Sequence, residues 1–174
     1  MKSFVVDVPE NIRFISQLKY KLFIDGNSKN GVGAWSACIL DVKEKEFIVC
    51  GMKKDDPLIE KDKECEDRME LVAIINGIKW ILGEYDNETK PHVKITIHSD
   101  NVYAINIARE WISLWKNSNF ENRPNADLLR ELSPLLDLSQ ITFIWTSQQA
   151  NDYMKKCRDL CFEMLTNQSS EIAH

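Results

Sequence analysis

Short apolar runs separated by polar turn residues mark the first third of the chain, and this pattern predicts β-strands. Residues 20–25, 33–42 and 46–52 are short runs rich in apolar side chains. Residues 26–31, with the sequence Gly-Asn-Ser-Lys-Asn-Gly, form a predicted turn between the first two strands. Three strands in such close succession are typical of an antiparallel meander.

The apolar spacing then changes to the period of a helix. Helices are predicted at residues 68–83, 102–111, 126–136 and 152–165, and two further strands at residues 93–99 and 141–145. The resulting order, β-β-β-α-β-α-α-β-α, predicts an α/β fold in which helices cover both faces of a five-stranded mixed sheet. A chain of 174 residues is long enough for one such domain, which we expect at residues 19–166. Residues 1–18 are expected to form an N-terminal extension and residues 167–174 a polar C-terminal tail.

Composition narrows the function classes. The formal net charge of −5 argues against binding nucleic acid through a bulk positive field, but it allows a protein that places metal ions beside acids. No apolar run is long enough to cross a bilayer, and the first residues lack the pattern of a secretory leader, so no membrane partner is expected. The five cysteines form no C-x-x-C pair, which favours reduced thiols and a cytoplasmic location.

Three acids fall at positions that the predicted topology brings together. Asp25 is expected at the end of the first strand and Asp100 at the end of the fourth, so parallel pairing of these strands places both at one sheet edge. Glu70 lies in the first turn of the connecting helix, in a row with Ile74 that faces the sheet. Carboxylates without a basic partner suit Mg²⁺ or Mn²⁺. Taken singly, each acid is better explained by a turn or by the helix dipole, and only their joint placement points to a metal site.

The same residues carry a resemblance to a known family. The motifs are Phe-Ile-Asp-Gly-Asn at 23–27, Arg-Met-Glu-Leu at 68–71, His-Ser-Asp-Asn-Val-Tyr at 98–103, Trp-Ile-Ser-Leu-Trp-Lys at 111–116, Asn-Ala-Asp-Leu at 125–128 and Ile-Trp at 144–145. In this order and spacing they resemble type 1 ribonuclease H. The resemblance covers roughly residues 20–165 and implies a ribonuclease H-like fold.

The resemblance also implies an activity and a catalytic site. The family cleaves the RNA strand of RNA–DNA hybrids with two Mg²⁺ ions held by four acids, leaving a 5′-phosphate and a 3′-hydroxyl. Mn²⁺ is expected to substitute. By position, the first three catalytic, metal-binding acids are Asp25, Glu70 and Asp100. An ungapped count from Trp145 makes Asp159 the fourth, with Asp152 as the alternative.

Candidate substrate contacts surround these acids. Gly26, Asn27, Asn101 and Gln149 are the proposed set, and Gln149 falls where the family usually has a histidine that assists turnover. Glutamine donates a hydrogen bond but cannot carry a proton near neutral pH, so slower turnover is expected.

Two other differences from the family pattern are expected to weaken the binding of a hybrid. Glu66 and Asp67 stand where relatives have neutral residues that touch the nucleic-acid backbone; alternatively, they cap the helix and point away. The segment at 111–116 resembles the helical protrusion of the family, and residues 109–130 around it carry few basic side chains. Trp111, Trp115 and Phe120 are expected to pack in this protrusion rather than to stack on bases.

The leading hypothesis is a monomeric, metal-dependent endonuclease that acts on RNA–DNA hybrids. The alternative is a weakly active or inactive binding module that serves as a scaffold in a larger replication or reverse-transcription assembly. A third reading keeps the nuclease but gives it a branched or single-stranded DNA substrate. Metal binding separates the scaffold from the enzymes, and a substrate panel separates the two nucleases.

Overall fold

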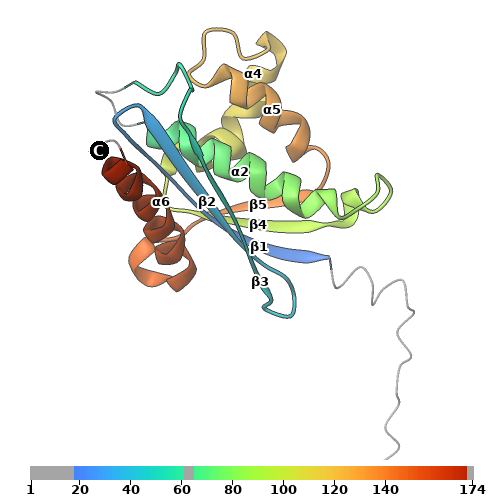
Figure 1. The fold of residues 1–174 in the computed structure, drawn as a ribbon. Helices are drawn as coiled ribbons and strands as arrows, with labels where there is room; N and C mark the ends of the chain where they lie inside the picture. Colours follow the sequence, from blue (N-terminus) through green and yellow to red (C-terminus); the bar gives the residue numbers. More distant parts are fainter. Residues whose placement is uncertain (1–17, 61–64, 172–174) are drawn as a thin grey trace, which may run out of the picture.

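A five-stranded mixed sheet organises the computed structural model, which describes residues 18–60 and 65–171 (Figure 1). The strands are β1 (Lys19–Lys29), β2 (Val32–Leu40), β3 (Glu46–Lys53), β4 (Lys94–Ser99) and β5 (Gln140–Trp145), in the spatial order β3-β2-β1-β4-β5. The first three strands are antiparallel, whereas β4 runs parallel to β1 and to β5. The predicted meander and the parallel pairing of the first and fourth strands are confirmed.

Helices cover both faces of this sheet, as predicted (Figure 1). The α-helices are α2 (Glu66–Gly83), α3 (Val102–Asn106), α4 (Ile112–Trp115), α5 (Ala126–Leu136) and α6 (Asp152–Glu171). Short helical turns are η1 (Lys90–His92), η2 (Ile107–Trp111), η3 (Lys116–Ser118) and η4 (Gln148–Ala150). The α2 helix packs on one face with α5 beside it, and α6 packs on the other.

The pleat of β1 divides the core between the two faces. Leu22 and Ile24 point into the large cluster under α2, whereas Phe23 points into a smaller cluster under α6. Cys157 belongs to the α6 cluster and Cys161 to a neighbouring one, and both are buried free thiols. The central strand is therefore buried on both sides, which fixes its register because a one-residue slip would exchange the two faces.

The first strand extends farther than the sequence predicts. A turn is predicted at residues 26–31, but residues 26–29 continue β1 and pair with β2, for example Gly26 with Trp35. The turn is confined to Asn30 and Gly31, both of which have positive φ. Asp25 therefore lies inside β1 rather than at its end. Asp25 nevertheless lies beyond the part of β1 that pairs with the parallel strand β4, because that pairing stops at Phe23.

Two helices also differ from the prediction. The predicted helix 102–111 continues as α4 after the π-helical turn η2. The last helix does not end at Leu165 but continues to Glu171, so part of the expected polar tail is helical. The expected extension falls outside the described residues, apart from Leu18, as do residues 172–174. No helix in the described ranges has the length and hydropathy to cross a membrane.

Aromatic side chains hold the protrusion together. The ring centroids of Trp111 and Trp115 lie 5.4 Å apart, and the ring of Tyr103 meets Trp111 edge-on at 6.2 Å. Phe120 is buried, and Arg123 lies over the Trp115 ring at 4.6 Å. The predicted packing role of these aromatics is confirmed, because Trp111 and Trp115 pack against the core and Phe120 belongs to it.

Candidate active site

Asp25, Glu70 and Asp100 converge from three separate elements. Asp25 is on β1, Glu70 is in the first turn of α2, and Asp100 directly follows β4. One carboxylate oxygen from each lies within 4.8 Å of the others. Asp25 and Glu70 are 5% and 2% exposed, and Asp100 is half-buried. The structure thus gathers the three acids at the edge where the parallel strands end.

Gly26 makes this convergence sterically feasible. Its backbone N–H donates a hydrogen bond to Glu70 Oε1 at 3.2 Å. A Cβ at position 26 would lie 2.3 Å from the backbone nitrogen of Glu70 and 2.4 Å from the carbonyl carbon of Met69. Only glycine lets β1 touch the start of α2 this closely. Ser99 Oγ holds the other oxygen of Glu70 with a 3.1 Å hydrogen bond.

The three carboxyl groups resist ionising together. Burial raises the pKa of Glu70 well above its usual value, and the nearby Asp25 and Asp100 raise it further. Burial, then the charge of Asp100, raises the pKa of Asp25 to about 7. Burial also raises the pKa of Asp100. A divalent cation among them would reverse this penalty, and a donor set made only of oxygens fits Mg²⁺ or Mn²⁺.

A cleft of about 540 Å³ opens over the acids. Its lining residues are Asp25, Gly26, Asn27, Glu66, Asp67, Glu70, Asp100, Asn101, Val102, Tyr103, Gln148 and Arg158. Glu66 and Asp67 therefore face the cleft, and the alternative in which they point away is wrong. Asp67 accepts a 2.8 Å hydrogen bond from Asn101 Nδ2, so part of its charge is held by an amide.

Three of the four predicted substrate-binding residues line this cleft, and the fourth does not. Gly26, Asn27 and Asn101 line it, but Gln149 is exposed and lies outside the lining. Its neighbour Gln148 points in and donates a 3.0 Å hydrogen bond from Nε2 to Asp25 Oδ1. Gln148 and not Gln149 points into the cleft because both lie in the 3₁₀ turn η4, where successive side chains are rotated by about 120°. The loop has no apolar periodicity from which the turn could be predicted.

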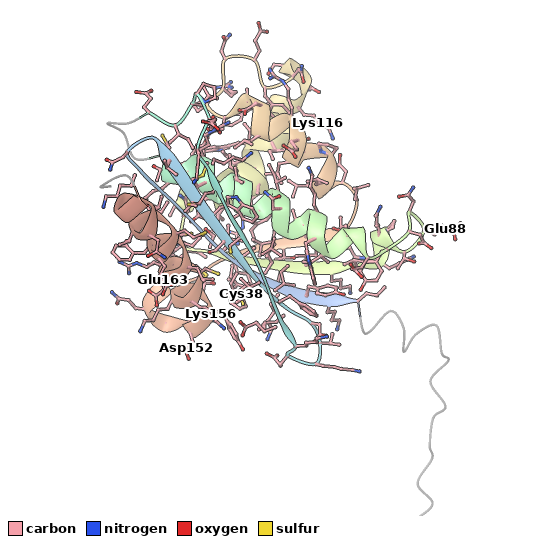
Figure 2. All side chains as sticks on the ribbon, in the orientation of Figure 1. Cys38, Glu88, Lys116, Asp152, Lys156 and Glu163 are labelled. Carbon is pink, nitrogen blue, oxygen red and sulfur yellow. The ribbon has the colours of Figure 1, made fainter. Side chains whose placement is uncertain are left out.

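The predicted fourth acid is on α6 but away from the cluster. Asp159 lines a separate surface depression together with Asp152, and Figure 2 shows Asp152, Lys156 and Glu163 along that part of the helix. Neither Asp159 nor Asp152 is among the acids gathered in the described residues. The α6 side chain that lines the cleft is Arg158. The side chains of adjacent residues in a helix point about 100° apart. An offset of one residue in the count therefore changes which side chain of α6 is predicted to face the cluster.

The apolar positions of α6 could have identified Arg158. Met154, Cys157 and Cys161 form the buried face, and Arg158 flanks it one turn after Met154. Because α6 crosses β1 near Asp25, this flank is the part of the helix that meets the cleft.

Fold and site together define a mixed α/β domain with an acidic cleft at the carboxyl ends of its parallel strands. The RNase H family model matches residues 17–155, and the chain belongs to this family. It is 28% identical to Ribonuclease H of Acetivibrio thermocellus over 162 residues, which cover 88% of this chain and 99% of the relative. It is 30% identical to Ribonuclease H of Syntrophomonas wolfei over 128 residues, or 69% of this chain and 77% of the relative.

Solved structures agree with this fold. LC9-RNase H1, described as a type 1 RNase H with the type 2 active-site motif, superposes with a TM-score of 0.69 at 12% identity, covering 94% of this chain and 76% of that one. The protease–reverse transcriptase of prototype foamy virus superposes with a TM-score of 0.62 at 12% identity, covering 84% of this chain but 20% of the viral one. At such identities the likeness establishes the fold alone.

Proposed function

We propose that the protein is an endonuclease that hydrolyses the RNA strand of RNA–DNA hybrids with a divalent ion held by Asp25, Glu70 and Asp100. The observation that carries the proposal is the meeting of these three carboxylates within 4.8 Å, at the base of a cleft in a chain of the RNase H family. Mg²⁺ is the proposed ion and Mn²⁺ its substitute, because both prefer oxygen ligands.

When bound, the ion supplies positive charge to a phosphate oxygen and orients the attacking water. The chain's own residues would position the strand. Asn27, Asn101 and Tyr103 line the cleft and offer polar groups to phosphate and sugar. Glu70 is proposed to meet a ribose 2′-hydroxyl, which distinguishes RNA from DNA. The proposed products are a 5′-phosphate and a 3′-hydroxyl.

Gln148 is proposed to orient Asp25. Its amide donates to Oδ1 of that carboxylate, and such a hydrogen bond fixes the orientation in which the carboxylate would meet an ion. We therefore propose Gln148, in place of the predicted Gln149, as the polar side chain that this loop contributes to the site. We propose that the protein works as a monomer, with any larger replication or reverse-transcription assembly formed through other surfaces.

Cleavage of a hybrid labelled separately on each strand tests the proposal. We expect cutting of the RNA strand with Mg²⁺ and with Mn²⁺, and none in EDTA. Asp25→Asn should slow cutting at least about 100-fold, because a lost ion contact costs several kcal/mol in the transition state. Lys155→Gln, an exposed change on α6, is the matched control. Intact RNA under every condition, with folded protein, would contradict the proposal.

The second candidate function is a binding module that cuts slowly or not at all. The missing fourth acid favours it, since three acids gather in the described residues and the α6 side chain at the cleft is Arg158. Fewer carboxylates hold fewer catalytic ions, which slows cutting but leaves the polar groups that contact a strand. If the protein binds hybrid in EDTA as tightly as in Mg²⁺ and cuts nothing, this second function is the correct one.

A further inference from the structure

The acidic cleft contains one basic side chain whose role the proposed function leaves open. Among the described residues that line the cleft, Arg158 alone is basic. Its side chain is exposed, and within the described ranges the guanidinium has no hydrogen bond or ion pair of its own. A free guanidinium beside several carboxyl groups is available for a ligand, because its five N–H donors are not used within the fold.

The position of Arg158 is incompatible with a second ion held from α6. An acid on the last helix was expected to complete a four-acid site, yet Asp159 and Asp152 face the other depression and Arg158 faces the cleft. A guanidinium stays protonated and has no acceptor, so it cannot ligate a cation. The ligands present in the cluster, from Asp25, Glu70 and Asp100, suffice for one divalent ion completed by water.

Charge leads to the same conclusion. Arg158 lines the same cleft as Asp25 and Asp100, so its positive charge faces these acids across one space. A cation on the α6 side of the cleft would lie beside the guanidinium of Arg158 and be repelled by it. Arg158 thus disfavours a second ion on that side, while Glu66 and Asp67 keep the cleft as a whole acidic.

We infer that this cleft binds one divalent ion and that Arg158 takes the place of a second, with its guanidinium donating to a phosphate oxygen of the nucleic acid. The inference rests on the proposed function and specifies its ion count and phosphate contact. Arginine suits this role because its planar fork of N–H groups matches phosphate oxygens. Arg158 is thereby a substrate-binding residue, and the residue on α6 that replaces a metal ligand.

The number of bound ions tests the inference without reference to catalysis. Free Mn²⁺ would be measured by electron paramagnetic resonance during titration of the purified full chain. We expect one tight site in the wild type and in Arg158→Gln, and a second site in Arg158→Asp, which restores a carboxylate on this side of α6. Two sites in the wild type, or one site in Arg158→Asp, would overturn the inference. Loss of a site in Asp159→Asn would overturn it as well.

Affinity for a hybrid tests the phosphate contact. In Mg²⁺ and on an uncleavable 2′-O-methyl RNA–DNA hybrid, Arg158→Gln should weaken binding about tenfold and make it less dependent on salt. Lys155→Gln removes the same charge from the same helix and should change neither property. Equal affinity of wild type and Arg158→Gln would overturn the contact. Thermal unfolding of each variant verifies folding. Failure of the wild type to cut any hybrid would refute the proposed function, whereas the ion count decides the inference alone.

Discussion

At the scale of single residues, the site depends on how closely β1 and α2 approach. Gly26 lies against the backbone of Met69 and Glu70, so close backbone contact brings together the elements that carry Asp25 and Glu70. The sequence suggested that residue 26 belongs to a turn, where glycine is common. The structure gives another reason for glycine, which is the absence of space for a Cβ.

The first prediction concerns this glycine. Gly26→Ala should destabilise the fold by about 1–3 kcal/mol and reduce ion binding, because the new methyl group forces β1 and α2 apart. Gly83→Ala is the control, since a Cβ there meets nothing within 4 Å and alanine favours the helix. Urea unfolding with and without Mn²⁺ measures both effects. Equal stability of the two variants would show that the close approach is not tight.

The second prediction is a pH dependence in the absence of divalent ions. Burial raises the pKa of Asp25 from its usual 3.8 to about 7, so the folded protein keeps a proton that the unfolded chain has released. The free energy of unfolding in EDTA should therefore fall as pH rises from 3.8 to about 7. Mg²⁺ should restore stability most strongly at the upper end.

Asp25→Asn provides the control for this measurement, because it removes the titrating group at nearly constant shape. Its free energy of unfolding should depend less on pH than that of the wild type over the same range. Identical slopes for the two proteins would mean that Asp25 does not titrate with folding.

The sequence was least informative about the direction in which single side chains point. Gln148 and Arg158 line the cleft, one position before the predicted Gln149 and Asp159. The offset from Gln149 to Gln148 arises in the 3₁₀ turn η4, and the offset from Asp159 to Arg158 arises after that turn, on the helix α6. The three acids on β1, α2 and β4 were predictable because regular elements with clear apolar periods carry them.

At the scale of elements, Arg68 joins three segments. Its guanidinium makes ion pairs with Asp56 at 2.8 Å and with Asp127 at 2.7 Å, and it donates to Asn125 at 3.3 Å. It thereby ties the start of α2 to the loop after β3 and to the start of α5. The side chain is 7% exposed, so little solvent screens these contacts.

The third prediction follows from this arrangement. Arg68→Met should destabilise the protein by about 3–5 kcal/mol, since it leaves buried Asp56 without its cation. Lys79→Gln removes an exposed ion pair with Glu131 on the same helix and should cost less than about 1 kcal/mol. Urea unfolding of the two variants makes the comparison. Similar losses in both would show that burial adds nothing to the Arg68 pairs.

Element order was predictable, but element ends were not. The strongly periodic helix at α5 has the predicted bounds, because its leucines recur at helical spacing. The ends of β1 and α6 depend on partners distant in sequence. β1 continues because β2 pairs with it as far as Val32, and α6 continues where Leu165 packs near Ala34. A local pattern does not contain such information.

At the scale of the whole molecule, the fold concentrates negative charge at one edge. The chain carries a net charge of −5, and five of its acids line the cleft with one arginine. Affinity for nucleic acid should therefore depend on divalent ions, which convert the cleft from repulsive to attractive. Hybrid binding measured by fluorescence anisotropy should be at least about tenfold weaker in EDTA than in Ca²⁺ or Mg²⁺. Equal binding would contradict this dependence.

The most direct test of the central claim is Mn²⁺ binding and RNA-strand cleavage measured on the same samples of wild type and Glu70→Gln. Glutamine keeps the shape of this 2%-exposed side chain but removes its charge, so the fold should be retained. We expect the ion affinity of Glu70→Gln to fall at least about tenfold and its cleavage rate at least about 100-fold. Cleavage of the RNA strand by Glu70→Gln at the wild-type rate would show that the three gathered acids are not the catalytic metal site.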